Sequence, residues 1–585
     1  MNSRAVVGLA AAAALVSQLV GCAQGGRIRQ PQPSERRAAA PQTKDTGWPT
    51  FGHDYFNTRH VSLARINSRT VRSLHVAWKF QSGRYGSFES TPVVAGRTMF
   101  LTLPPDDTVV ALDATNGKVK WRYVPTLEPV KLCCGSVNRG VAIGDRTVYV
   151  ATLDDRLVAL DAQTGALRWQ ERIADPTQGY SETMAPLVWN GMVFVGISGA
   201  DIGIRGSLTA YSAASGRLLW RWWSVSPGWE GRFAPPAHRN IAQEKASARR
   251  FRDAWRRGGG SIWMTPALDP ARSTIYAATG NPFPVVDGSR RPGDNLYTDS
   301  VVALDVKTGR MRWYFQEVAH DLWDYDAASP PVLFDTHDAA GRRIAAVGEA
   351  GKTGWFYILN RANGALIRRS QPFVPQWHMF AVPGAQGAYA EPGGGGGAVA
   401  PVAFDASSDQ VFVAAVDQHH FARPADPYWF TTSPTRYGIT AVNVSTGRRA
   451  WQHWFPSTGE IKMTNNGTAG ACSVDDVVFV GEESTGKFDA LDARSGSLLW
   501  QFQTSAGAPG TGAGTRSISQ LLHDWLAPAK RALLHEPQLK PASHIHASPV
   551  AYSVNGVEYV AIGGDAFYRT GDSRGDTLYA FSLPR

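Results

Sequence analysis

One pattern of apolar and polar residues recurs along this chain. Each copy has a short apolar run, a polar turn containing Thr-Gly, Ser-Gly or Asn-Gly, and a second short run that ends in tryptophan. Such a pattern predicts two antiparallel strands joined by a tight turn. Full copies span 111–121, 159–169, 210–220, 303–313, 441–451 and 490–500, and a degenerate copy that lacks the tryptophan spans 358–368.

The spacing of these copies predicts the fold. Successive tryptophans from Trp78 to Trp220 are 43, 48 and 51 residues apart. A period of about 40–50 residues with short strands is typical of propeller blades, whereas a β-sandwich array would not repeat one hairpin with a fixed tryptophan. Counting Trp78 as a further copy, the sequence predicts an all-β, eight-bladed β-propeller whose tryptophans pack between blades. Residues 576–581 form a further predicted strand that closes the ring with the N-terminal strand.

The predicted propeller occupies residues 47–585 and carries two insertions. A charged, helical stretch is expected near 240–257, in the long interval between two repeats. A second insertion near 510–545 contains a short apolar-periodic segment and is expected to lie on the surface.

The N-terminus has the features of a targeting segment. Residues 1–21 carry one charge, Arg4, followed by an apolar run that is too short to span a bilayer. A small residue directly before Cys22 resembles the bacterial lipoprotein signal, in which the cysteine is lipidated; a plain secretory signal is the alternative. Residues 22–46 then form a flexible tether. This arrangement predicts a periplasmic protein of a Gram-negative bacterium, anchored to the outer membrane through Cys22.

Composition limits the classes of partner. The 585 residues carry a net charge of +10, but no long run of lysine and arginine. The excess charge is therefore spread over the surface, and no nucleic-acid motif is present. We expect no nucleic-acid partner.

Two adjacent cysteines, Cys133 and Cys134, are the most unusual local feature. A disulfide between neighbours closes a strained ring and constrains almost nothing in the unfolded chain. Its use would be local, such as presenting a flat, rigid surface to a ligand; two free thiols are the alternative. With Cys22 assigned to lipid, Cys472 remains, and we expect it to be a buried free thiol.

From about Trp48 to the C-terminus the sequence resembles the pyrroloquinoline quinone (PQQ)-dependent alcohol dehydrogenases, which are eight-bladed quinoproteins. The resemblance includes the opening WPTFGHDYFNTRHVSLARIN, the tryptophan repeats and several site motifs. It implies that PQQ lies on the propeller axis between a vicinal disulfide, matched by Cys133 and Cys134, and a tryptophan, matched by Trp263. The in-plane contacts of PQQ fall on Glu89, Arg139, Thr183, Ser198 and Lys352.

The resemblance also implies a cation beside the quinone, either Ca²⁺ or a lanthanide. Its ligands match Asp201, Asn281, Asp324 and Asp326. Asp201 stands where methanol-oxidising members have glutamate, which is one methylene longer. Asp326 follows Asp324 by two residues, so the two carboxylates share a face of an extended chain. An aspartate at this offset is an extra ligand in the lanthanide-using branch, although some calcium-using relatives have one too.

Asp324, in the motif HDLWDYD, matches the catalytic base of the family. The implied reaction is removal of the substrate hydroxyl proton by Asp324 while hydride passes to PQQ. The substrate is then a small alcohol, or a sugar or polyol hydroxyl. No CxxCH motif occurs, so no haem c is fused to the chain, and a separate acceptor, cytochrome c or a quinone, is expected.

Two other functions remain open, the first because the lipoprotein signal and the blades alone would fit it, and the second because of one departure from the family. The run GGGGGAVAP at 393–401 places Ala398 and Val399 where the family often has an asparagine-tryptophan pair, so one cofactor contact is missing. The first alternative is a non-catalytic propeller lipoprotein of the outer-membrane assembly type. The second is a degenerate quinoprotein that binds PQQ poorly.

Overall fold

The computed structural model describes residues 45–84, 86–233, 240–338, 340–426, 428–457, 469–483, 485–504, 543–566 and 576–584. The expected signal peptide at 1–21, nearly all of the tether at 22–46 and nearly all of the insertion at 510–545 lie outside these residues. No helix in the described ranges is both long and apolar enough to cross a membrane.

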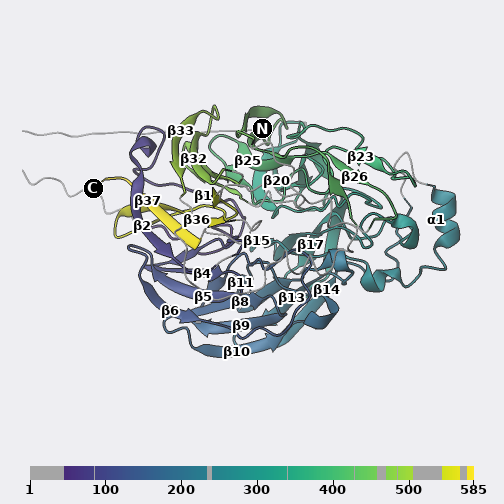
Figure 1. The fold of residues 1–585 in the computed structure, drawn as a ribbon, viewed down its shortest axis with the longest axis horizontal. Helices are drawn as coiled ribbons and strands as arrows, with labels where there is room; N and C mark the ends of the chain where they lie inside the picture. The colour runs from purple at the N-terminus through teal and green to yellow at the C-terminus, as the bar shows by residue number, and fades with distance from the viewer. Residues whose placement is uncertain are drawn as a thin grey trace, which may run out of the picture. The chain divides into compact units, whose positions relative to one another are not determined.

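The described residues form nine sheets, of which one has three strands and the other eight each contain a four-stranded antiparallel blade (Figure 1). The first blade comprises β3 (Val93–Ala95), β4 (Thr98–Leu103), β5 (Thr108–Asp113) and β6 (Val119–Tyr123). The second comprises β7 (Ala142–Gly144), β8 (Thr147–Thr152), β9 (Arg156–Asp161) and β10 (Leu167–Arg172). The third comprises β11 (Leu187–Trp189), β12 (Met192–Gly196), β13 (Ser207–Ser212) and β14 (Leu218–Trp223).

The next four blades follow in chain order. The fourth comprises β15 (Ala267–Asp269), β16 (Thr274–Ala278), β17 (Ser300–Asp305) and β18 (Met311–Gln316). The fifth comprises β19 (Val332–His337), β20 (Arg343–Ala350), β21 (Phe356–Asn360) and β22 (Leu366–Arg369). The sixth comprises β24 (Ala403–Asp405), β25 (Gln410–Asp417), β28 (Arg436–Asn443) and β29 (Arg449–Trp454). The seventh comprises β30 (Ala471–Val474), β31 (Val477–Glu482), β32 (Lys487–Asp492) and β33 (Leu498–Gln503), and β1 (His60–Val61) pairs with β30.

The eighth blade joins the two ends of the described chain. It comprises β35 (Val550–Val554), β36 (Val557–Ala566), β37 (Asp576–Ser582) and β2 (His75–Gln81), and β34 (Ser543–His544) also pairs with β36. Trp78 on β2 lies opposite Ala580 on β37. The predicted eight-bladed ring, closed by its terminal strands, is confirmed.

The repeat tryptophans hold neighbouring blades together. Each lies on the outermost strand of its blade and donates its indole N–H to a backbone carbonyl of the next blade. The donor-acceptor pairs are Trp78–Ala114, Trp121–Ala162, Trp169–Ala213, Trp220–Val306, Trp313–Arg361, Trp451–Ala493 and Trp500–Leu74, at 2.8–3.2 Å. In the degenerate copy Arg368 takes this place and donates to the carbonyl of Val444 at 3.3 Å. These contacts run around the whole ring.

A glycine in the turn of the next blade lies directly beneath six of the seven docked rings, all except that of Trp500. Gly309 has φ of 69°, and a Cβ built on it would lie 2.5 Å from Cε3 of Trp220. The same close approach recurs at Gly117, Gly165, Gly216, Gly364 and Gly496. Two features therefore require glycine at this position of the sequence pattern. One is the positive φ of the turn, and the other is the tryptophan ring, which leaves no space for a side chain.

The segment that precedes β1 crosses the first strands of several blades. Its backbone at Trp48, Tyr55, Phe56, Thr58 and Arg59 hydrogen-bonds to β3, β15, β19, β24 and β30. The fully buried guanidinium of Arg59 donates to the carbonyls of Phe51, Ala471 and Pro549, and burial lowers its pKa to about 10. This segment ties blades together at the end of the first strands.

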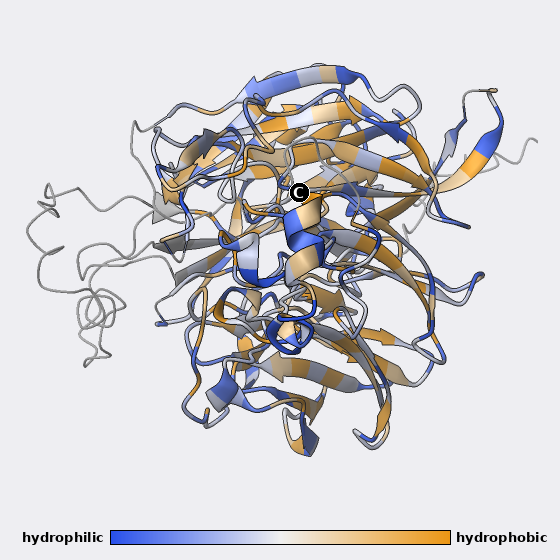
Figure 2. Ribbon diagram, turned by 90° about the vertical axis from the view of Figure 1, so that its right-hand side faces the viewer, coloured by the Kyte–Doolittle hydropathy of each residue, from blue (hydrophilic) through white to orange (hydrophobic). Residues whose placement is uncertain are grey.

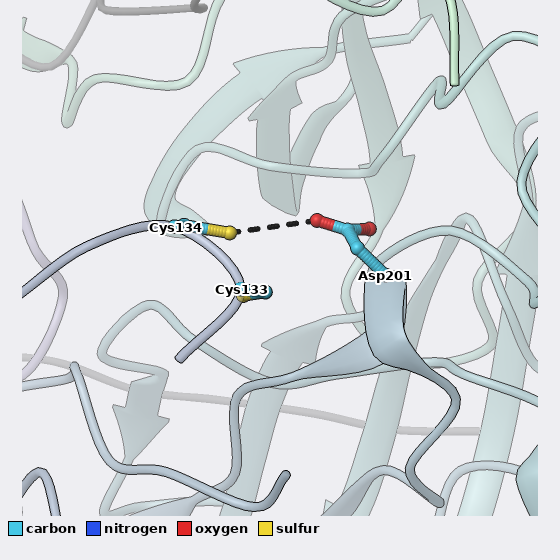
Figure 3. A group of neighbouring side chains, drawn as sticks. All are labelled: Cys133, Cys134 and Asp201. Atoms are coloured by element: carbon cyan, nitrogen blue, oxygen red, sulfur yellow. Dashed lines mark hydrogen bonds between the residues drawn. The ribbon is translucent and has the colours of Figure 1, made fainter. Parts of the chain in front are cut away.

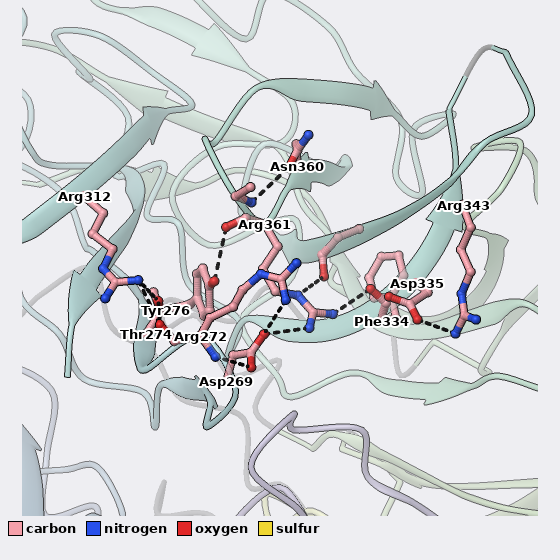
Figure 4. A network of polar contacts seen from close by, with 12 residues as sticks. Asp269, Arg272, Thr274, Tyr276, Arg312, Phe334, Asp335, Arg343, Asn360 and Arg361 are labelled. Atoms are coloured by element: carbon pink, nitrogen blue, oxygen red, sulfur yellow. Dashed lines mark hydrogen bonds and ion pairs between the residues drawn. The ribbon is translucent and has the colours of Figure 1, made fainter.

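Buried polar contacts add further links between blades four and five (Figure 4). Arg361 forms an ion pair with Asp269 at 3.0 Å and donates to the carbonyl of Phe334 at 2.7 Å. The Tyr276 hydroxyl donates to the carbonyl of Arg361 at 3.1 Å. Figure 2 shows that hydrophobic residues are concentrated along the strands, with hydrophilic residues mainly in the loops.

Part of the stretch near 240–257 is helical, as the sequence suggested, and a small additional sheet was not predicted. Helix α1 (Ile241–Ser247) and a 3-10 turn at Ala254–Arg257 fill the interval between blades three and four, and α1 projects beside the strands in Figure 1. The three-stranded sheet consists of β23 (Ala388–Ala390), β26 (His420–Ala422) and β27 (Phe430–Thr431).

The docking contact predicts an outcome for a glycine substitution. Gly309→Ala should lower the free energy of unfolding by about 3 kcal/mol, because the methyl group is both strained at positive φ and forced against Trp220. Gly341→Ala is the matched control, since Gly341 has φ of 75° but no atom within 4 Å of the position that an added Cβ would take. It should cost about 1 kcal/mol. Equal losses in denaturant unfolding would contradict the docking role of Gly309.

Candidate functional site

The residues expected to form the site lie at one end of the blades. First and second strands are antiparallel, so the start of one and the end of the other meet at the same end of each blade. Glu89, Arg139, Thr183, Trp263, Asp324 and Asp326 come before first strands, and Ser198, Asn281 and Lys352 follow second strands. First strands of several neighbouring blades contact one another, so these positions converge.

Lys352 lies at the centre of one group. Its ammonium forms ion pairs with Oδ2 of Asp324 at 2.9 Å and Oδ2 of Asp326 at 2.8 Å, and all three side chains are buried. Burial opposes the charge on Lys352, but Asp324 and Asp326 outweigh it and raise its pKa. A charged lysine therefore holds both carboxylates of HDLWDYD, although the positive φ of Asp324 shows that this segment is not the extended chain from which a shared face was predicted.

Asp324 and Asp326 differ in the oxygen atoms that they leave available. Oδ1 of Asp324 is buried and accepts no hydrogen bond from the described residues. Both oxygens of Asp326 are engaged, Oδ1 by the backbone N–H of Asn281 and Oδ2 by Lys352. Asp324 also has a positive φ of 67°, a conformation that non-glycine residues seldom adopt. Asp324 thus presents one free carboxylate oxygen in a buried position.

Electrostatics raises the proton affinity of Asp324. Burial raises the pKa of its carboxyl well above the usual range, Lys352 lowers it, and the carboxylates of Asp326 and Asp201 raise it again. Burial and Asp326 likewise raise the pKa of Asp201. Clustered, desolvated carboxyl groups of this kind are suited to accept a proton or to bind a cation.

Asp201 lies in a 3-10 turn at Ala200–Ile202 and faces the cysteine pair (Figure 3). Sγ of Cys134 donates to Oδ2 of Asp201 at 3.5 Å, and the Asp201 carboxylate and the two sulfur atoms lie within 4.8 Å of one another. Cys133 and Cys134 are free cysteines in the structure, so the expected vicinal disulfide is not formed in it. The Cys134 thiol is directed instead to the carboxylate.

Cys472 is free and fully buried, as predicted.

A second group of expected residues surrounds Arg139. Its guanidinium forms an ion pair with Glu89 at 2.8 Å, donates to the carbonyl of Thr183 at 3.3 Å, and lies 4.9 Å from the centre of the Trp263 ring. The Thr183 and Ser198 hydroxyls are hydrogen-bonded at 2.7 Å. The segment that carries Trp263 also contacts the segment that carries Asp201. The hydroxyl of Ser261 accepts a hydrogen bond from the backbone N–H of Ala200, the residue before Asp201.

Two residues near the base were not predicted from the sequence. The Tyr428 hydroxyl lies 3.3 Å from Oδ2 of both Asp201 and Asp324, and the Trp429 indole N–H donates to Oδ2 of Asp324 at 3.3 Å. Both precede β27, in the small sheet inserted between β25 and β28. They belong to no repeat and to no recognised motif; the adjacent aromatic residues 428–430 were the available signal.

Comparison with known proteins identifies the family. The model of the "Glucose/ethanol/alcohol dehydrogenase, beta-propeller domain" matches residues 48–392, which is more than half of the chain. The protein therefore belongs to this PQQ dehydrogenase family. A second model, "Outer membrane protein assembly factor BamB", matches residues 405–521.

Individual relatives agree with this family. The chain is 28% identical over 584 residues to the quinoprotein alcohol dehydrogenase PedH of Pseudomonas putida, a match that covers 90% of this chain and 89% of the relative. It is 29% identical to a lanthanide-dependent methanol dehydrogenase of Methylorubrum extorquens, covering 78% and 82%. The crystal structure of the quinohemoprotein alcohol dehydrogenase of Comamonas testosteroni superposes with a TM-score of 0.75 at 28% identity, covering 94% of this chain and 82% of that one.

The donors present fit the groups that the family implies. The unpartnered Oδ1 of Asp324 and the carboxylate of Asp201 are oxygen donors suited to a hard cation. Arg139 and Lys352 supply buried positive charge suited to an anionic quinone, and the Trp263 ring supplies a flat apolar face. Asp201, Asp324 and Asp326 do not all lie within 4.8 Å of one another in the described structure, so a bound cation would draw its ligands closer.

Proposed function

We propose that the protein is a PQQ-dependent dehydrogenase that oxidises an alcohol, with Asp324 as its general base. The observation that carries this proposal is the buried Asp324 carboxylate, which is held by Lys352 through one oxygen and leaves the other without a partner among the described residues. A base needs one fixed geometry and one free lone pair, and this carboxylate has both. Membership of the dehydrogenase family supports the reaction class.

Each residue has a proposed role. Asp324 accepts the hydroxyl proton of the substrate at Oδ1, and Lys352 fixes Oδ2. Arg139 with Glu89, Thr183 and Ser198, together with Trp263 and the cysteine pair, binds and orients the cofactor. PQQ, when bound, supplies the acceptor for the substrate hydride, and a bound cation supplies Lewis acidity.

The cation is proposed to be held by Asp201, Asn281 and Asp324. Asp326 is the expected extra ligand, but its two oxygens already contact Lys352 and the Asn281 backbone. It would need to exchange one of these contacts in order to bind metal. Similarity to a lanthanide-dependent methanol dehydrogenase supports testing a trivalent ion beside Ca²⁺.

Export, anchoring and electron transfer complete the proposal. We infer a periplasmic enzyme attached to the outer membrane through lipid on Cys22, and electron transfer to a separate cytochrome c or quinone. The match of residues 405–521 to the BamB family favours the competing propeller scaffold over part of the chain. That function does not require the Lys352–Asp324–Asp326 cluster, so loss of activity on changing the cluster separates the two.

Asp324→Asn tests the base. The amide keeps the size of the side chain but cannot take a proton, so turnover should fall about 10²- to 10⁴-fold while PQQ is retained. Asp335→Asn, on the exposed face of β19, is the matched control and should leave turnover unchanged. The measurement is dye-linked alcohol oxidation together with the PQQ content of the purified protein. Near-normal turnover in Asp324→Asn would exclude the assignment.

The identity of the ion is tested by titration. Metal-free protein should regain activity with Ca²⁺ or with La³⁺, and the three nearby carboxylates favour the ion of higher charge. If Asp326 becomes a ligand, Asp326→Ala should weaken La³⁺ activation more than Ca²⁺ activation. Full activity with Ca²⁺ alone, unchanged in Asp326→Ala, would show that Asp326 is not a ligand.

A further inference from the structure

We propose that Gly394 and Gly395, within the glycine run 393–397, leave the space that Trp429 occupies, so that Trp429 and Tyr428 act as positioning residues for the base Asp324. This inference rests on the proposed dehydrogenase function and deepens it. The blade pattern and the family motifs do not explain the five consecutive glycines at 393–397, and this inference gives a structural reason for two of them.

The run is packed too closely for any side chain. A Cβ on Gly394 would lie 2.1 Å from Nε1 of Trp429 and 2.6 Å from the carbonyl oxygen of Trp323, the residue before Asp324. A Cβ on Gly395 would lie 2.9 Å from Cη2 of Trp429. Distances under about 3 Å cannot be relieved without moving one of these groups.

Backbone conformation does not account for these glycines. Among residues 393–397, Gly397 is the one with a positive φ, at 77°. The other four have ordinary backbone angles, so what they require is space and not conformational freedom. Gly397 itself packs against the Lys352 backbone, because its Cβ would lie 2.2 Å from the carbonyl oxygen of Lys352. The run therefore contacts Trp429 at Gly394 and Gly395 and Lys352 at Gly397.

Trp429 is fixed from a second side by His420. The rings are 4.4 Å apart in an edge-to-face arrangement, and Nδ1 of His420 accepts from the backbone N–H of Gly393 at 3.1 Å. This bond places the histidine proton on Nε2. Glycine run, histidine and tryptophan thus form one packed unit at the end of β26.

The unit acts on one oxygen of the base. Oδ2 of Asp324 receives the Trp429 indole N–H and the Lys352 ammonium, and the Tyr428 hydroxyl lies between it and Oδ2 of Asp201. With Oδ2 held from these sides, the carboxylate cannot rotate without losing these contacts, and Oδ1 stays turned to the unpartnered position. Positioning partners of this kind typically change activity by about 10- to 100-fold.

Ala398 and Val399 lie in the protein interior. Both are buried, and Ala398 packs in the core of the fifth and sixth blades. The aromatic residues that contact the base come from the inserted small sheet.

The test compares three variants, Trp429→Phe, Tyr428→Phe and Gly394→Ala, and the double variant Gly394→Ala/Trp429→Phe. Each single change should lower kcat about 10- to 100-fold with little change in KM or in PQQ content. The double variant should lose less than the product of the two single losses, because both changes disturb one contact. Losses that multiply, or single variants with unchanged kcat, would overturn the proposal.

Two controls and one structural readout complete the design. Gly384→Ala, with no atom within 4 Å of the added methyl group, and Tyr389→Phe, on exposed β23, should both match the wild type. A crystal structure of cofactor-free Gly394→Ala should show Trp429 moved away from Asp324. If the wild-type protein oxidises no alcohol, the proposed function is wrong. The crystal structure of Gly394→Ala still tests the packing of Gly394 against Trp429, and an unmoved Trp429 would overturn this inference.

Discussion

The structure depends on the contact between each outer-strand tryptophan and the next blade. At six blades an indole ring covers a turn glycine and donates to a neighbouring carbonyl, Arg368 replaces the tryptophan at the fifth blade, and Trp500 completes the circuit by donating to Leu74 beside β2. A ring closed in this way packs its last blade against its first, so that the remaining sheet edges are short. It also fixes where strand ends converge, and the proposed site consists of residues at those ends.

The site concentrates buried charge that the rigid ring holds in place. Three carboxylates and one lysine meet at the ends of blades three to five, and the lysine compensates two of the carboxylates directly. Burying charged groups costs free energy unless they are paired and hydrogen-bonded. A catalytic or binding role therefore accounts for this cluster better than a contribution to folding stability does. The unpartnered oxygen of Asp324 is the point at which the pairing is incomplete.

The repeats made the fold predictable, because each blade is a local hairpin that carries its own tryptophan and glycine. Even the degenerate copy keeps its place, with Arg368 reaching the carbonyl that an indole would reach. Asp324 and Lys352 were predictable from motifs at strand ends. Tyr428 and Trp429 were not, because they enter from an insertion whose position depends on packing against the glycine run. Cys133 and Cys134 are also free in the structure, where a disulfide was expected, and Cys134 contacts Asp201.

The central claim is that this end of the propeller binds PQQ between the cysteine pair and Trp263. The most direct measurement is an absorbance titration of cofactor-free protein with PQQ in the presence of Ca²⁺ or La³⁺. We predict saturable binding of one PQQ per chain, weakened in Trp263→Ala and Arg139→Leu. Absence of binding by the wild-type protein with either cation would contradict the claim.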